Sequence, residues 1–472
     1  MNVEELLQKG IGLAGKGLWR DAMSVFELIL DAYPNEPRAL YNAAVVQDIT
    51  GHRDHALALL RRSMDADPSF ANPYHYLGQL YLQAGSYAEA YKSFRAAIAR
   101  DVEFSAAYEG LRKSSVALGR NTLEDDAEAD VVFYTGGPPF HGKTLEKAGL
   151  GGSESALIYV ARALAEHGKR VRVFCNCDCP GMYDGVRYDE LVDFHLYRKQ
   201  RQFSALISSR SMRPFKIALQ ARLRILWIHD DVNVAFLKDD NPRDLPIDRI
   251  FAISQWQRGE WARHFGIPNE KFYLTRNGVD LTVFKPDARR ERYRLIYISR
   301  PNRGLEVLLE LFPDIRQQVP DAELHLYTYF VPGDEMDNAV MQKARQPGVF
   351  IRGSLPKAAL AAEIAASRLM VYPATFRETS CIAAIESQAA GTPVVASTLA
   401  ALPETVIDGV TGFLVPGDPR TSEFKSNFVG KVVSLLRDDA AWQRLSQGAH
   451  QRCESFYNWQ IIAREWLNEL RC

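Results

Sequence analysis

The sequence lacks several features, and each absence excludes a class of protein. Six cysteines in 472 residues are too few for a disulfide framework and favour a reducing compartment, so we expect a cytoplasmic protein. The formal charge of −1 gives no electrostatic basis for binding nucleic acid. No apolar run approaches bilayer-spanning length, and residues 1–12 lack a signal-peptide core, so we expect peripheral membrane contact at most.

Three of the cysteines, Cys175, Cys177 and Cys179, form a cluster after an apolar segment. Their one-residue spacing on an extended chain would direct all three side chains the same way, with no fourth ligand nearby. We therefore predict a strand-end loop with free thiols, and a soft-metal site is the alternative.

A repeat of 34 residues occupies residues 1–120. The recurring positions are Gly17, Gly51, Gly85 and Gly119; Ala22, Ala56 and Ala90; Phe26, Leu60 and Phe94; and Pro34 and Pro68. Each unit contains two apolar-periodic helical segments, with a turn at the glycine and a stop at the proline. This pattern resembles the tetratricopeptide repeat (TPR), with three repeats and a capping helix at 104–118. Such a stack would bind a peptide or protein in its groove; stiffening of the chain or dimerisation are the alternatives.

The rest of the chain predicts two α/β domains. Five acids in ten residues make 121–130 a linker, after which short apolar strands alternate with helices. Alternation of this kind predicts parallel sheets covered on both faces, and the turn-rich segment 276–292 predicts a break between two doubly wound domains that share a cleft. The expected domains are 131–285 and 286–455, followed by an amphipathic C-terminal helix within 456–472. The expected strands are 131–135, 171–175, 224–229, 249–254, 294–299, 323–329, 348–353, 368–373 and 393–397.

Two glutamates, Glu378 and Glu386, lie eight positions apart in a segment that is otherwise small or apolar. The segment follows a predicted strand, and its helix is expected to begin near Ser380. The N–H groups of Thr379, Ser380 and Cys381 would then face the cleft and suit a diphosphate. The two carboxylates would accept hydrogen bonds from the hydroxyls of a hexose and a ribose. The alternatives are that Glu378 complements the helix dipole and that Glu386 is solvated.

The pattern Glu-x7-Glu followed by "GTPVVAS" resembles the signature of family 4 glycosyltransferases, which are retaining and metal-independent. The resemblance covers about 131–470 and implies the GT-B fold, in which two Rossmann-like domains face each other. It also implies that Glu378 contacts the transferred sugar and Glu386 the donor ribose. Ile382 would lie beside them in the donor site.

A second match is "YISRPNRGLEVLLE", which resembles the strand, turn and helix that carry two cations in this family. Arg300 and Arg303 are the cations here, whereas the usual pattern has a lysine five positions after the arginine. Two cations beside a helix N-terminus would offset the charge that develops on a leaving diphosphate. The alternative is a pair of solvated surface arginines.

Three weaker matches lie elsewhere. Gly151 and Gly152 precede a helix at 153–168 and would let the backbone approach a ligand, although glycines also make ordinary turns. By resemblance this loop lies against the donor sugar and phosphates. His229, at a strand end, would contact the transferred sugar near its reacting carbon, and an ordinary loop histidine is the alternative. Leu355 would line the nucleobase through its backbone.

These matches predict a retaining hexose transferase with a UDP- or GDP-linked donor and no cofactor. His229, Arg300, Arg303 and Glu378 would act at the reacting centre. No metal is expected, since the only Asp-x-Asp stretch is Asp65 to Asp67, inside the repeats. A sugar-nucleotide epimerase or hydrolase and a non-catalytic adaptor are the alternatives.

The acceptor is less defined by the sequence. Repeats fused to a two-domain transferase resemble the organisation of protein O-GlcNAc transferases, which favours a protein or peptide acceptor. A lipid-linked or polysaccharide acceptor is the alternative. The basic stretch 198–201 is interpreted as a solvated face rather than a lipid contact.

Overall fold

The chain folds into two compact units. The first comprises 1–126 and 192–200, and the second comprises 127–191 and 201–472. Of the predicted linker 121–130, only Ala129 and Asp130 lie within the described part. The structure is a computed structural model that describes residues 2–101, 104–119, 129–147, 149–177, 179–233, 241–287, 290–331 and 333–471.

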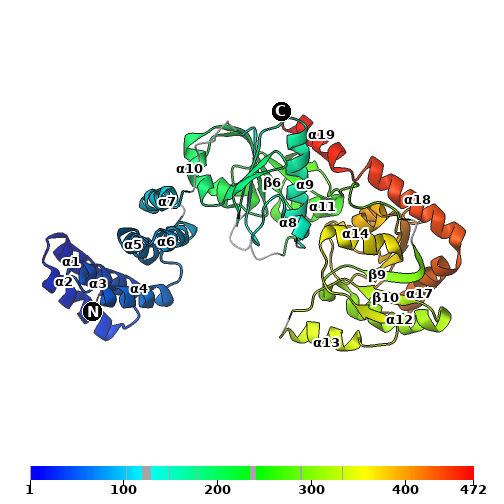
Figure 1. Ribbon diagram of the computed structural model, residues 1–472, viewed down its shortest axis with the longest axis horizontal. Helices are drawn as coiled ribbons and strands as arrows, with labels where there is room; N and C mark the ends of the chain where they lie inside the picture. The colour runs from blue at the N-terminus through cyan, green and yellow to red at the C-terminus, as the bar shows by residue number, and fades with distance from the viewer. Residues whose placement is uncertain are drawn as a thin grey trace. The chain divides into compact units, whose positions relative to one another are not determined.

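The first unit is built from consecutive helix pairs, seen in blue in Figure 1. Gly17, Gly51 and Gly85 occupy the turns with φ of +76°, +89° and +72°, a conformation that glycine adopts without strain. The 34-residue spacing therefore marks helix pairs, as predicted, while the assignment to the TPR family stays a prediction. The helices are α1 (Val3–Gly15), α2 (Trp19–Ala32), α3 (Pro37–Ile49), α4 (Arg53–Ala66), α5 (Ala71–Gln83), α6 (Tyr87–Arg100) and α7 (Ser105–Ala117).

A segment from the α/β part of the sequence belongs to the same unit. Val192, just before α10 (Asp193–Gln200), packs into the core of α6 and α7. The rings of His195 and Tyr108 have their centroids 5.9 Å apart. Arg198, predicted to be solvated, is only 5% exposed, so that prediction is wrong for this residue. Packing of α10 removes its side chain from water.

The second unit contains an eight-stranded sheet in the order β3-β4-β2-β1-β5-β6-β7-β8. Only β3 is antiparallel to its neighbour, so the predicted parallel sheet is confirmed. The strands are β1 (Val131–Thr135), β2 (Val171–Cys175), β3 (Gly181–Tyr183), β4 (Val186–Glu190), β5 (Phe203–Ser209), β6 (Ala221–Trp227), β7 (Arg249–Ala252) and β8 (Phe272–Leu274). The accompanying helices are α8 (Thr144–Lys147), α9 (Gly152–Glu166) and α11 (Gln255–Phe265).

A six-stranded sheet, entirely parallel, follows in the order β11-β10-β9-β12-β13-β14. Its central strands are buried along their length because helices cover both faces. The strands are β9 (Glu291–Tyr297), β10 (Glu323–Leu326), β11 (Val349–Ile351), β12 (Ser367–Tyr372), β13 (Val394–Ser397) and β14 (Gly412–Val415). The helices are α12 (Leu305–Gln318), α13 (Glu335–Lys343), α14 (Lys357–Ala366), α15 (Ile382–Ala389), α16 (Leu402–Thr405), α17 (Ser422–Arg437) and α18 (Asp439–Ser455).

The final helix, α19 (Trp459–Glu469), returns to the first sheet and lies beside α9 (Figure 1). The Trp466 ring packs edge-on against the rings of Trp227 and Phe251, each at 4.9 Å between centroids. Its Nε1–H donates to Thr275 Oγ1 at 2.7 Å, so the one polar atom of the indole is paired. Among the described residues, no helix is both long and apolar enough to cross a bilayer.

Candidate active site

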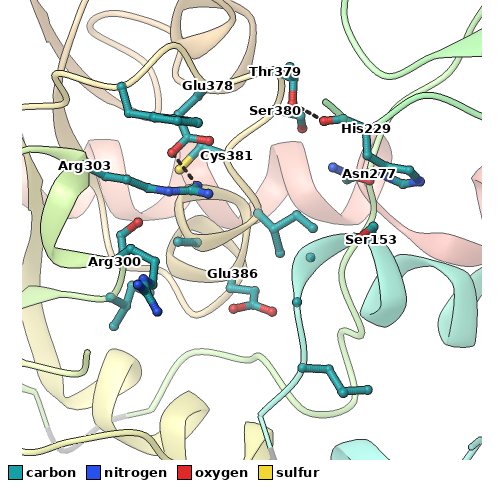
Figure 2. Close-up of a pocket in the computed structure, with 18 of the residues that line it drawn as sticks. Ser153, His229, Asn277, Arg300, Arg303, Glu378, Thr379, Ser380, Cys381 and Glu386 are labelled. Atoms are coloured by element: carbon teal, nitrogen blue, oxygen red, sulfur yellow. Dashed lines mark hydrogen bonds and ion pairs between the residues drawn. The ribbon is translucent and has the colours of Figure 1, made fainter. Parts of the chain in front are cut away.

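A cavity of about 930 Å³ opens at the carboxyl ends of the strands of both sheets in the second unit. This is the edge at which parallel α/β sheets bind ligands, because loops and helix N-termini converge there. Figure 2 shows Arg300, Arg303 and Glu378 on one side of the cavity, with Ser153, His229 and Asn277 on the other. Every predicted site residue lines it: Gly151, Gly152, His229, Arg300, Arg303, Leu355, Glu378, Thr379, Ser380, Cys381, Ile382 and Glu386.

The helix that carries Glu386 begins two residues later than predicted. α15 starts at Ile382, with Cys381 as its N-cap in an extended conformation, so Ser380 lies outside the helix and Glu378 precedes it. Thr379, Ser380 and Cys381, whose N–H groups were predicted to suit a diphosphate, line the cavity together with Ile382 and Ala383 at the helix start. Thr379 Oγ1 donates to the carbonyl of His229 at 2.6 Å, which ties the segment before the helix to the loop after β6.

Glu378 is the centre of a buried polar cluster. Arg303 Nη1 donates to Glu378 Oε1 at 2.9 Å, and the Tyr372 hydroxyl donates to the same oxygen. Glu378 is only 4% exposed, so it depends on these two donors for its charge. Burial lowers the pKa of Arg303, and the nearby Glu378 carboxylate raises it. The net effect is a raised pKa. Arg303 is therefore held as a charged guanidinium against Glu378 at the cavity surface.

Arg300 and Arg303 bracket a short 3₁₀ turn, Pro301–Arg303, after β9. The Arg300 guanidinium lies 4.6 Å from the centroid of the Tyr329 ring, which orients it beside the cavity. Gly304 follows with φ of +113°, and a β-carbon there would lie 2.2 Å from the carbonyl oxygen of Pro373. Only glycine therefore lets this turn sit against the end of β12 and place both arginines in the cavity.

The second glutamate forms an ion pair that the sequence did not indicate. Lys357 Nζ donates to Glu386 Oε1, with Glu386 5% exposed and the lysine side chain 14% exposed. Lys357 is the first residue of α14 and lines the cavity, as does Leu355 just before the helix. The surface interpretation of Glu386 is thus excluded, and Lys357 joins the candidate site.

The glycine loop before α9 allows two helix starts to approach each other. A β-carbon on Gly151 would lie 2.4 Å from Glu154 Oε2, and one on Gly152 would lie 2.9 Å from Ile382 Cδ1. Since Ile382 begins α15, the missing side chains bring the starts of α9 and α15 together at one end of the cavity. The requirement for glycine here comes from this approach.

His229 lies at the end of β6 and is 8% exposed. Its ring packs on Trp227 with centroids 4.2 Å apart, and its Nε2 has no hydrogen-bond partner among the described residues. Burial, with a contribution from the Arg210 charge, lowers the pKa of His229 to about 3. The imidazole is therefore neutral at physiological pH, and Nε2 is available to a hydroxyl group.

This lowered pKa predicts a pH dependence of stability. The unfolded histidine takes up a proton below about pH 6.5, whereas the folded one, with a pKa of about 3, does not. The contribution of His229 to the free energy of unfolding is complete above pH 6.5 and is lost as the pH falls towards 3. Between pH 8 and pH 5 the free energy of unfolding is expected to decrease by about 2 kcal/mol for this reason. Urea unfolding of wild type and His229→Gln across this range measures it. His264→Gln, at an exposed position, is the control; equal pH slopes for wild type and His229→Gln contradict the prediction.

Arg210 is a cavity residue that the sequence analysis missed. It follows β5 with φ of +56°, a conformation rare for a residue with a side chain, and such residues gather at functional sites. Its guanidinium forks onto Asp230, at 2.5 and 3.2 Å, and its Nη1 lies 3.2 Å from Ser153 Oγ and 3.5 Å from Glu154 Oε1. A positive φ leaves no mark in the sequence for an arginine, so only the structure identifies this position.

The cysteine cluster does not match the geometry expected of it. Cys175 and Cys177 are buried and Cys179 is exposed, so the three side chains do not face the same way. None of the three cysteines forms a disulfide bond within the described residues, in line with the prediction. Within the described ranges, no three His, Cys, Asp or Glu side chains are grouped so as to hold a metal ion.

Comparison with known families locates one domain. The family described as "Glycosyl transferases group 1" matches residues 292–438, which span the second sheet from β9 to α17. An MMP alpha-(1->4)-mannosyltransferase from Mycolicibacterium hassiacum is 27% identical over 223 residues, covering 46% of this chain and 53% of that protein. The chain thus spans about half the length of the curated relatives it matches.

Solved structures give the fold. A sucrose-phosphate synthase from Thermosynechococcus elongatus superimposes with a TM-score of 0.59 at 18% identity, covering 72% of this chain and 98% of that one. The Anabaena protein HepE, solved in complex with UDP-glucose, gives a TM-score of 0.56 at 15% identity, covering 72% of this chain and 99% of that one. The α/β unit therefore has a GT-B-like fold, and residues 292–438 match the family described as glycosyl transferases group 1.

Proposed function

We propose that this chain is a retaining glycosyltransferase that moves a hexose from a UDP- or GDP-linked sugar to an acceptor hydroxyl. One observation carries the proposal. Two arginines, the start of α15 and two buried glutamates line a single cavity at the carboxyl edge of the sheets. Its volume of about 930 Å³ accommodates a sugar nucleotide. A group 1 domain at 292–438, and relatives that include a mannosyltransferase and a structure in complex with UDP-glucose, support it.

The donor diphosphate would lie against a surface we call the cationic wall, formed by Arg300, Arg303, Lys357 and the N–H groups at the start of α15. A helix start and guanidinium groups both favour phosphate, the first through its dipole and the second through forked hydrogen bonds. Glu386 would accept hydrogen bonds from the ribose and Glu378 from the transferred sugar. Leu355, also in the lining, would contact the base through its backbone.

The proposed reaction occurs on one face of the sugar. The bond from the anomeric carbon to the phosphate oxygen breaks while the acceptor oxygen bonds to that carbon from the same face. The acceptor proton passes to the departing phosphate oxygen, so no enzyme nucleophile is needed. Arg300 and Arg303 would stabilise the charge that develops on the diphosphate, the task that magnesium performs in other transferases. Neutral His229 would hold a sugar hydroxyl through Nε2.

Donor binding has to compete with an ion pair in the free protein. Arg303 is engaged with Glu378, and the Tyr372 hydroxyl contributes a second hydrogen bond to that carboxylate. A diphosphate would draw Arg303 away, after which Tyr372 and a sugar hydroxyl would hold Glu378. The exchange preserves the number of charge-assisted hydrogen bonds, so it costs little. The same logic applies to Lys357 and Glu386 when a ribose binds.

The acceptor is proposed to be a protein or peptide recruited by the helical unit. Stacked helix pairs present a groove of the kind that binds extended or helical peptides. If the acceptor were instead lipid-linked, the transferred sugar would be found in membrane fractions. If it were a polysaccharide, the transferred sugar would be found in soluble glycan.

A two-stage experiment tests the proposal. The full chain is first heated with each of a set of UDP- and GDP-linked sugars, and one series is expected to raise Tm. At a hundredfold excess of donor over its Kd, the folded state is stabilised by about 2.7 kcal/mol. Proteins co-expressed with the chain are then examined by mass spectrometry for added hexose. Stabilisation without any transfer, and with release of free sugar, indicates a hydrolase instead. No response to any donor contradicts the proposal.

A further inference from the structure

The cavity is lined by charges of opposite sign on its two sides. Glu154, Asp230 and Asp231 belong to the side formed by α9 and the ends of β5 and β6, opposite the cationic wall. We call this side, with Glu260 behind Asp231, the acidic wall. Its two cations at the cavity are Arg210 and Arg377, and Arg263 also pairs with Glu260, so the four carboxylates are matched by three guanidinium groups.

Both of those cations are already occupied. Arg210 forks onto Asp230 and reaches Glu154, and Arg377 pairs with Glu260 and, at 3.4 Å, with Asp231. Arg377 also stacks on Trp256, at 4.8 Å from the ring centroid. An anionic acceptor would have to compete for these guanidinium groups with Asp230 and Asp231, whose side chains are 20% and 15% exposed. The acidic wall therefore holds no guanidinium that is free for an incoming phosphate within the described residues.

Uncharged polar atoms remain available on the same side. His229 Nε2 and Asn277 Oδ1 are buried without a hydrogen-bond partner among the described residues. Figure 2 shows the two side chains next to each other beside Ser153. The Asn277 amide suits an acceptor hydroxyl, which both donates and accepts, whereas the neutral imidazole is assigned to the transferred sugar and the Ser153 hydroxyl already donates to Glu154 Oε2. They supply no positive charge to offset an anion.

We propose that the acidic wall sets the acceptor specificity of this site: the reacting hydroxyl belongs to an uncharged or basic acceptor, and a phosphate or carboxylate beside it is rejected. This rests on the proposed function, because it assigns the cationic wall to the donor and leaves the acidic wall to the acceptor. Like-charge repulsion in a partly desolvated cavity is expected to disfavour the anionic member of a matched acceptor pair at least about tenfold.

The test compares acceptors that differ only in charge. Serine peptides with a neighbouring alanine, lysine or phosphoserine form one series, and methyl glucoside and glucose 6-phosphate form the other; kcat/KM is measured for each at saturating donor. The proposal predicts at least tenfold lower kcat/KM for the phosphorylated member of whichever series is used. Equal or faster transfer to a phosphorylated acceptor overturns it. So does transfer to none of the neutral or basic acceptors while the donor is bound.

Two variants link the discrimination to the wall. Asp231→Asn leaves Arg377 paired with Glu260. In this variant, the ratio of kcat/KM for the neutral acceptor to kcat/KM for the phosphorylated acceptor is expected to fall about fivefold, while donor KM stays unchanged. Glu423→Gln makes the same charge change on exposed α17 and is expected to leave the ratio as in wild type. An unchanged ratio in Asp231→Asn contradicts the role of the wall. Nucleoside diphosphate binding is measured first by calorimetry, since its absence shows that the proposed function has failed rather than the acceptor assignment.

Discussion

Replacing Arg303 by alanine is expected to lower kcat for sugar transfer by about 10² to 10³-fold, the usual cost of removing one donor aimed at developing charge. The guanidinium is placed by the turn before Gly304, and it is charged and held 2.9 Å from Glu378. Its loss would leave the departing diphosphate with Arg300, Lys357 and the start of α15. The measurement is steady-state kinetics with a saturating donor.

The same variant has a foreseeable structural side effect. Glu378 is 4% exposed and would keep only the Tyr372 hydroxyl as a partner, so Tm has to be measured alongside. Arg303→Lys keeps the charge but not the forked geometry and is expected to recover part of the lost kcat. Arg444→Ala, an exposed arginine on α18, is the matched control. Wild-type kcat in a folded Arg303→Ala protein contradicts the assignment.

Replacing Glu386 by alanine is expected to raise donor KM by about 10 to 100-fold with a smaller change in kcat. Hydrogen bonds from a ribose diol to a carboxylate are each worth about 1.5–3 kcal/mol, and they are made in the ground state as well as in the transition state. Since Lys357 would be left nearly buried without its partner, the single variant is also expected to unfold at lower temperature.

A double variant separates these two effects. Glu386→Ala combined with Lys357→Met removes the unpaired ammonium group and is expected to recover stability while donor KM stays high. Glu423→Ala, on the exposed start of α17, serves as the control for the loss of a carboxylate. If donor KM is that of wild type in the double variant, Glu386 does not bind the donor.

Much of the fold could be predicted from local patterns. Strands β12 and β13 of the second sheet are buried along their whole length and are mostly apolar, so they stand out from their surroundings. β5 was missed, although it is central in its sheet between β1 and β6. Its sequence, Phe203–Ser209, is half serine and alanine, which have low strand propensity, and pairing on both sides decides its conformation.

The candidate site residues could be predicted where they stand out from their neighbours in the sequence. Glu378 and Glu386 are conspicuous because they interrupt a segment that is otherwise small or apolar, and Arg300 and Arg303 because they follow a strand and precede a glycine. Their partners were not predictable in the same way. Lys357 pairs with a residue 29 positions away, so nothing near it in the sequence marks it.

Boundaries and exposure were set by tertiary contacts. Ser380 is a good N-cap residue, yet the helix begins only after Cys381, and Thr379 beside it is tied by a hydrogen bond to the carbonyl of His229. Arg198 lies in a basic stretch typical of a solvated face, and it is buried because its segment belongs to the helical unit. Local propensity gives way in both places to a contact between segments far apart in the sequence.

Calorimetric titration of the full chain with UDP, GDP, uridine and guanosine tests the central claim most directly, because it measures the diphosphate site without an acceptor. One of the two diphosphates is expected to bind at one site per chain and at least about 100-fold more tightly than its nucleoside, an advantage of about 2.7 kcal/mol that Arg303→Ala largely removes. Binding of a nucleoside as tightly as its diphosphate, or no binding of either diphosphate, contradicts the account.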